Sequence, residues 1–278
     1  MIARIFARAG AAHLHRDARR LRTAILFAAF AIAVPARLMA TDFRGVRLNV
    51  SDPDSAAEWY AKHLGATLVR GDARLVRHVQ FGKIVLEFVP VYVSPPIWPV
   101  LGSVGSGVDH LGFAYADLDK AMEQFAKSGV EIVSGIEREG PIRYAFIKDH
   151  WGTLIELVED REIHGFHHVH LATTDPVATL KWYTDVFGGQ VARYAGVLPG
   201  IRYGDMWVLV KKVKTAPAPT EGRAIGRLDW SVAGFRELQP RLSATHLPFS
   251  VKGVTRDLTE ITIDGPDRVQ LSILATRH

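Results

Sequence analysis

The chain of 278 residues contains no cysteine. This absence excludes disulfide bonds, thiolate metal sites and a lipid anchor attached through cysteine. Any metal that the protein binds must therefore be held by histidine, aspartate or glutamate. Nitrogen and oxygen ligands of this kind suit Fe, Mn, Ni, Co and Zn, so the composition leaves the identity of a divalent metal open.

Several common catalytic motifs are also absent. The sequence has no glycine-rich phosphate-binding loop, no Gly-x-Ser-x-Gly nucleophile turn and no zinc-protease helix motif. Strong charge is missing from most of the chain as well. Seven arginines and one aspartate give residues 1–40 a charge of +6, so the remainder carries −1 of the total of +5. A nearly neutral body of this kind does not indicate a nucleic-acid-binding protein.

The N-terminal segment has the order of a secretory signal peptide. Arginines precede an apolar run of eleven residues at 24–34, Pro35 follows it, and Ala40 offers a small residue for cleavage. The run is too short to span a membrane, which takes about 20 apolar residues. We expect residues 1–40 to be removed, leaving an exported protein, periplasmic or secreted, with no stable membrane span. An uncleaved anchor is the alternative, and the sequence does not decide between the general and the twin-arginine export routes.

The rest of the chain contains an internal repeat. The segment FRGVRLNVSDPDSAAEWYAKHLGA from Phe43 matches FHHVHLATTDPVATLKWYTDVFGG from Phe166 at an offset of 123 residues. Each copy opens with alternating strand residues, after which an Asp-Pro pair begins a helix and a glycine ends it. The same order recurs within each copy, from VDHLGFAYA and from AIGRLDWSV. We therefore predict four β-α-β-β-β modules.

The predicted fold class is α+β, with cup-shaped mixed sheets. We place modules one and two in a first domain at 41–160, and modules three and four in a second domain at 161–278. A cup lined by alternate strand residues is a natural site for a small molecule. A small-molecule substrate is accordingly the expected partner, and self-association is left open.

These features resemble the vicinal oxygen chelate superfamily, which includes glyoxalase I, extradiol dioxygenases and bleomycin-resistance proteins. The module openings resemble its pattern His-Val-x-Leu-x-Val-x-Asp, and GTLIELVED resembles its closing strand, over nearly all of residues 41–278. The resemblance implies two tandem domains of this type. It also implies metal ligands on the first and last strands of paired modules. In order along the chain, those positions hold Gly45 and Glu87, His110 and Glu156, His168 and Leu209, and Arg227 and Leu271.

The pairing of modules decides which of these residues meet. If module one pairs with module two, the expected metal ligands are Glu87, His110 and Glu156. If modules two and three pair, they are His168, His110 and Glu156, a set of two histidines and one carboxylate with open positions for substrate. A buried glutamate also has a simpler explanation, an ion pair with arginine, such as Arg47 or Arg143.

Two neighbours of His168 add to the predicted histidine cluster. Strand alternation places His168 and His170 on one face and His167 on the other, where we expect a solvated residue.

The resemblance implies a metal enzyme of the lyase, isomerase or dioxygenase type, in which the metal binds two neighbouring oxygens of the substrate. Glu156 or Glu87 is the expected catalytic base in an isomerase. The alternative is a metal-free protein that binds small molecules, which the non-ligating residues Gly45, Leu209, Arg227 and Leu271 favour. We lean towards the enzyme, and expect one metal site per chain.

Overall fold

The structure is a computed structural model that describes residues 41–278, with the exception of 71–74, 92–100, 254–256 and 277–278. The expected signal peptide at residues 1–40 lies outside these residues. Within them, no helix is long and apolar enough to cross a membrane.

Each of the four modules has the predicted order of strand, helix and three strands. Asp52 caps α1 (Pro53–Leu64) by accepting hydrogen bonds from two backbone N–H groups, and Asp175 caps α3 (Pro176–Phe187) in the same way through one. Both helices begin with proline, whose fixed φ suits the first turn. The other two modules contain α2 (Leu118–Lys127) and α4 (Phe235–Ala244).

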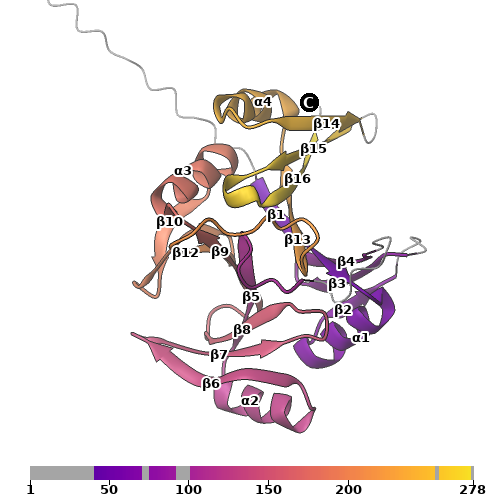
Figure 1. The fold of residues 1–278 in the computed structure, drawn as a ribbon, viewed down its shortest axis with the longest axis vertical. Helices are drawn as coiled ribbons and strands as arrows, with labels where there is room; N and C mark the ends of the chain where they lie inside the picture. Colours follow the sequence, from indigo (N-terminus) through magenta and orange to yellow (C-terminus); the bar gives the residue numbers. More distant parts are fainter. Residues whose placement is uncertain (1–40, 71–74, 92–100, 254–256, 277–278) are drawn as a thin grey trace, which may run out of the picture. The chain divides into compact units, whose positions relative to one another are not determined.

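Modules one and four form the first eight-stranded sheet (Figure 1). In spatial order its strands are β14 (Phe249–Gly253), β15 (Leu258–Asp264), β16 (Gln270–Thr276), β13 (Ile225–Val232), β1 (Thr41–Val50), β4 (Ile84–Pro90), β3 (Arg77–Phe81) and β2 (Thr67–Val69). The central strands β1 and β13 run antiparallel, while β4 and β16 run parallel to them on either side. A short 3-10 helix, Pro266–Arg268, precedes β16.

Modules two and three form the second sheet in the same way. In spatial order its strands are β10 (Gln190–Tyr194), β11 (Leu198–Tyr203), β12 (Met206–Lys212), β9 (Gly165–Thr173), β5 (Val108–Tyr115), β8 (Leu154–Glu159), β7 (Ile142–Lys148) and β6 (Glu131–Glu139). Here β5 and β9 are the central antiparallel pair, with β8 and β12 parallel to them.

The two mixed sheets and four helices confirm the predicted α+β class. The module pairing is the second of the two alternatives, because module two shares its sheet with module three. The domain boundary predicted at 160/161 therefore separates the two copies of the repeat along the chain. It does not separate two sheets, because the second sheet contains strands from both sides of it. The short linker there, residues 160–164, joins β8 directly to β9.

Alternate residues of the central strands separate an apolar core from the cup. On β5, Leu111 and Phe113 enter the main core, which also receives Phe43 from β1 and Phe166 from β9. The rings of Phe43 and Phe166 stack with their centroids 6.1 Å apart. Between the core residues of β5, His110 and its same-face neighbours point to the opposite side of the sheet, where the cup lies.

Candidate metal centre

Four buried side chains from three adjacent strands meet on the cup side of the second sheet. They are His110 on β5, Glu156 on β8, and His168 and His170 on β9. One possible ligand atom from each lies within 4.8 Å of the others, and no member is more than 6% exposed. Among the residues that the structure describes, this is the group of histidines and acids with the arrangement of a metal site.

The Glu156 carboxylate is at the centre of the contacts. Its Oε2 atom lies 2.8 Å from Nε2 of His110 and 3.3 Å from Nε2 of His168. Nδ1 of His170 lies 3.0 Å from Nε2 of His110. Two imidazoles thus contact the carboxylate and the third contacts His110, and three histidines with one carboxylate are a donor set that first-row divalent metals accept.

Strand register explains why these side chains meet. In the antiparallel pair of β5 and β9, His110 lies opposite His170 and Gly112 lies opposite His168. The parallel pairing of β5 with β8 then places Glu156 beside Gly112. Gly112 leaves the space that the His168 ring occupies, since a Cβ atom at this position would lie 2.0 Å from Cε1 of His168.

The structure thus brings together His110, Glu156 and His168, the set expected for pairing of modules two and three. Glu87 does not join them, because module one lies in the other sheet. Its Oε2 atom is 2.6 Å from Nε of Arg47 and 3.5 Å from Nη2 of Arg227. The simpler explanation for a glutamate in a strand, an ion pair with arginine, therefore describes Glu87.

His170 is the member of the cluster to which sequence reasoning assigned no ligand role. It lies beside Leu209 in the parallel pair of β9 and β12, just as Gly112 lies beside Glu156 in the pair of β5 and β8. Leu209 holds the family's fourth ligand position and has no ligating atom. His170 reaches the cluster from the neighbouring strand, and its shared face with His168 was the signal available in the sequence.

The expectation for His167 was wrong. A register shift places Gly112 opposite His168 but Phe113 opposite Phe166, so His167 is an extra residue in a β-bulge. The bulge breaks the alternation of side chains. His167 is fully buried, and its Nδ1 atom lies 2.8 Å from Nδ1 of His168.

A second carboxylate, that of Asp109, contacts the His110 ring at Nδ1, whereas Glu156 contacts it at Nε2. Asp109 Oδ1 lies 2.8 Å from Nδ1 of His110 and 2.7 Å from the ammonium of Lys211. Burial opposes ionisation of Asp109, but these two cationic or donating groups lower its pKa below the ordinary value. The ionised carboxylate accepts the Nδ1 hydrogen of His110 and leaves Nε2 facing the cluster.

The other members of the cluster are perturbed by burial and by one another. Burial lowers the pKa of His168 to about 4 and that of His170 well below its usual range. Burial would raise the pKa of Glu156, but its contacts with His168 and His110 hold it well below the ordinary value. His168 and His170 are thus neutral beside an ionised carboxylate, as metal coordination requires. Burial opposes protonation of His110, but Asp109 and Glu156 raise its pKa, so a metal bound there would displace a proton.

The unsatisfied atoms of the cluster fit a metal ion. Nε2 of His168 and Nε2 of His170 are buried and make no hydrogen bond to any part of the chain that the structure describes. Buried polar atoms without partners are uncommon in native proteins. Together with the close grouping of the four side chains, these nitrogens indicate that His110, Glu156, His168 and His170 would hold a divalent metal.

Apolar and aromatic side chains surround the cluster on the cup side. The Phe146 ring packs edge-on against His110 at 5.3 Å between centroids. A separate apolar cluster fills this side of the sheet, made up of Ala114, Ile142, Val158, Ile163, Tyr194, Trp207 and Leu209, with Tyr144, Ala192, Val197 and Leu198 packed against them. Such walls limit the access of water and strengthen electrostatic interactions at the cluster.

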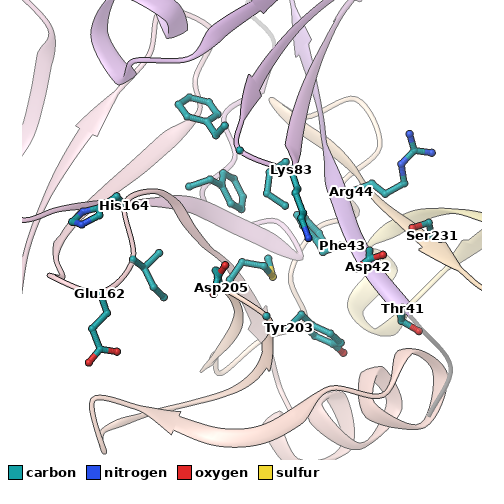
Figure 2. A pocket seen from close by; sticks show the side chains of 17 residues that line it. Thr41, Asp42, Phe43, Arg44, Lys83, Glu162, His164, Tyr203, Asp205 and Ser231 are labelled. Atoms are coloured by element: carbon teal, nitrogen blue, oxygen red, sulfur yellow. The ribbon is translucent and has the colours of Figure 1, made fainter. Parts of the chain in front are cut away.

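A pocket away from the metal cluster lies between strands of both sheets. It has a volume of about 580 Å³ and is lined by residues of β1, the β3–β4 turn, the linker before β9 and the β11–β12 turn. Figure 2 shows charged side chains of both signs around it, among them Lys83, Glu162 and Asp205. None of the four residues of the metal cluster lines this pocket, so its size alone does not make it the chemical centre.

The family is identified by a sequence profile. The Glyoxalase/Bleomycin resistance protein/Dioxygenase superfamily matches at residues 43–157 and 165–269, and the chain belongs to this superfamily. The two matched segments correspond to the two copies of the repeat. Among curated proteins, no significant match was found.

Solved structures show the same fold at low sequence identity. Glyoxalase I from Zea mays superposes with a TM-score of 0.70 at 16% identity, covering 86% of this chain and 94% of that one. A putative dioxygenase from Bacillus subtilis superposes with a TM-score of 0.62 at 18% identity, covering 84% of each chain. At these identities the likeness concerns the fold alone.

Proposed function

We propose that this protein is a divalent-metal-dependent enzyme that binds a small substrate through two neighbouring oxygen atoms. The observation that carries the proposal is the convergence of His110, Glu156, His168 and His170 in one buried cluster. A metal held there would act as a Lewis acid on the chelated oxygens. Fe, Mn, Ni, Co and Zn all accept this donor set.

The side chains of the cup have distinct tasks in this proposal. His110, His168 and Glu156 hold the metal, and His170 stands beside them as a fourth possible ligand. Phe146 and Trp207 supply aromatic surface against which the body of a substrate can pack. The substrate that these walls favour is a small oxygenated molecule with an apolar or aromatic body.

Between the reaction types, the ligand set favours the dioxygenase type over the lyase or isomerase type. Two histidines and one carboxylate leave open positions for a substrate and for oxygen. An isomerase needs a free base near the substrate. Glu87 lies in the other sheet, and the carboxylate of Glu156 is already engaged by His110 and His168.

The proposal is tested by metal content. Protein purified without a histidine tag should contain about one metal ion per chain, and His110→Ala and Glu156→Ala should each lose it. Glu87→Ala is the matched control and should retain the metal. Protein that takes up none of the five metals on reconstitution would sink the metal-enzyme proposal.

The reaction type is tested separately. Metal-loaded wild type is supplied with a panel of catechols while oxygen uptake is followed, and with α-hydroxycarbonyl compounds while isomerisation is followed. Oxygen uptake that disappears in Glu156→Ala supports the dioxygenase type. Isomerisation without oxygen uptake supports the lyase or isomerase type.

The alternative is metal-free binding of a small molecule, and the first sheet provides an observation in its favour. A pocket of about 240 Å³ lies there, lined in part by Arg44, Glu87, Arg227 and Asp229. Arg227 takes a position where the family places a metal ligand, and its Nε atom is 2.6 Å from Oδ1 of Asp229. Ligand binding that persists in chelator-treated protein would favour this function.

Export is a proposal that rests on the sequence of residues 1–40. Its test is the N-terminal sequence of the protein recovered from the periplasm or the medium of an expressing bacterium. Recovery there with a start near residue 41 would support it, and retention of the intact chain in the cytoplasm would contradict it.

A further inference from the structure

His167 is a buried polar residue that the proposed function does not use. The β-bulge turns it towards His168, so the two Nδ1 atoms lie 2.8 Å apart. A hydrogen bond at this distance requires one ring nitrogen to donate and the other to accept. The protonation of His167 therefore determines which nitrogen of His168 carries hydrogen.

Asp160 lies at the far side of the His167 ring. Its Oδ1 atom accepts hydrogen bonds from the backbone N–H groups of Glu162 and Ile163, at 2.7 and 3.0 Å. Its Oδ2 atom accepts one from the Tyr194 hydroxyl at 3.0 Å and lies 3.5 Å from Nε2 of His167. Nε2 of His167 is buried and makes no hydrogen bond within the described residues, and this carboxylate oxygen is its ion-pair neighbour. Because an ionised carboxylate can only accept, a hydrogen on Nε2 of His167 is the arrangement that suits this contact.

We propose that Asp160 and His167 are positioning residues that fix the tautomer of His168. With a hydrogen on Nε2 alone, His167 accepts at Nδ1. His168 must then donate from Nδ1, and its Nε2 atom keeps a lone pair. This is the atom that faces Glu156 at 3.3 Å and has no hydrogen bond within the described part of the chain.

The tautomer of His110 is fixed in a similar way, but by a carboxylate in direct contact and without an intervening histidine. Asp109 accepts directly from Nδ1 of His110 at 2.8 Å, which leaves Nε2 facing the cluster. Asp160 acts on His168 through the inserted His167. Carboxylates behind metal-binding histidines commonly fix the ring in this way, and their loss costs about 10- to 100-fold in metal affinity. The inference rests on the proposed function, because it assigns the residues a task in metal binding.

Asp160→Asn is the sharpest test, since it would change which nitrogen carries hydrogen in both His167 and His168. The amide oxygen stays with the two backbone N–H groups, so the amide nitrogen faces His167. Nε2 of His167 must then accept, and its hydrogen moves to Nδ1. His168 accepts at Nδ1 and carries hydrogen on Nε2, which blocks the lone pair.

The measurement is the dissociation constant for Zn²⁺, obtained by competition with a chromogenic chelator. We expect Asp160→Asn to weaken binding by about 10- to 100-fold. Asp175→Asn is the matched control: this aspartate caps α3 through a backbone N–H group and makes no contact with the cluster. It should bind Zn²⁺ as the wild type does.

A second pair of variants separates the relay from a purely structural role. His167→Asn keeps an acceptor oxygen near the position of Nδ1, whereas His167→Leu removes it. We expect the Asn variant to bind Zn²⁺ about tenfold more tightly than the Leu variant. ¹⁵N NMR of the Zn²⁺-loaded wild type should show hydrogen on Nδ1 of His168 and metal on Nε2. This pair also serves if Asp160→Asn does not fold.

The outcomes distinguish the two proposals. Wild type that binds no metal overturns the proposed function and this inference together. Wild type that binds Zn²⁺ while Asp160→Asn and His167→Leu bind equally well overturns the inference alone. Hydrogen on Nε2 of His168 in the Zn²⁺-loaded protein also overturns it.

Discussion

The imidazole of His168 lies directly over Gly112, so closely that a Cβ atom on Gly112 would come within 2.0 Å of its Cε1 atom. Strand β9 can place the ring of His168 in the cluster only because β5 has a glycine, with no side chain, opposite it. The candidate metal centre therefore requires a glycine at this position in addition to its possible ligands.

Gly112→Ala should accordingly reduce metal binding without removing a ligand. The added methyl group displaces the ring of His168, because backbone pairing on both sides prevents β5 from moving away. We expect Zn²⁺ affinity to fall by at least about tenfold, which corresponds to about 1.4 kcal/mol. Gly135→Ala on β6 is the control, since a Cβ atom there meets nothing within 4 Å. Equal affinity in both variants would show that His168 does not bind the metal.

His170→Gln tests whether the metal has three protein ligands or four. If His170 replaces the ligand missing at Leu209, its loss should weaken Zn²⁺ binding by about tenfold or more, measured by the same competition assay. The exposed His164, in the linker before β9, supplies the control variant His164→Gln. An unchanged dissociation constant in His170→Gln would establish a three-ligand site.

Glu87→Gln should affect stability and leave metal content unchanged. The carboxylate of Glu87 is half-buried between Arg47 and Arg227, so its neutralisation weakens two charged contacts. We expect the free energy of unfolding to fall by about 1–2 kcal/mol, less than the full contribution of about 1.5–3 kcal/mol for a hydrogen bond to a charged group, because Gln still accepts from both arginines. Denaturant titration measures this change, and elemental analysis checks the metal. Loss of metal would place Glu87 in the site after all.

Asp149→Asn should change how stability depends on pH. Asp149 is buried and accepts hydrogen bonds from the Tyr60 hydroxyl and from two backbone N–H groups. Burial raises its pKa above the ordinary value. Its contribution to stability is then fully present below the unfolded-state pKa and is lost as the pH rises through the folded-state pKa.

The amide variant lacks this titration. We therefore expect Asp149→Asn to gain stability relative to wild type as the pH rises above about 4, the ordinary pKa of aspartate. Denaturant unfolding of both proteins at several pH values measures the difference. The opposite slope would mean that the hydrogen bonds to Asp149 outweigh its burial.

The sequence predicted the local structure well because the signals for it are local. Asp52 and Asp175 cap helices as expected, and Gly65 ends the first helix in the left-handed region at φ 76°. The cup-facing positions of His110 and Glu156 followed from strand alternation and from the resemblance to the superfamily. These inferences needed no knowledge of how the modules associate.

Two features of the candidate metal centre could not be predicted from the sequence, for physical reasons. All four modules have the same periodicity, so the pairing of two with three depends on contacts between surfaces and not on any one segment. The β-bulge at His167 was also hidden, because alternation predicts regular strands and an inserted residue leaves the pattern of residue types unchanged. Both features alter which side chains meet, and neither alters the predicted secondary structure.

The crossed pairing of modules also sets an order of assembly. The second sheet uses one continuous stretch, from β5 to β12, whereas β1 at the start of the described chain must wait for β13, where Thr41 pairs with Val232. During synthesis, the strands that carry the candidate metal centre can pair before the C-terminal module exists. The first module meanwhile presents an unpaired strand edge, which invites association with other chains. The sheet that carries the candidate metal centre can thus form before the sheet of modules one and four is complete.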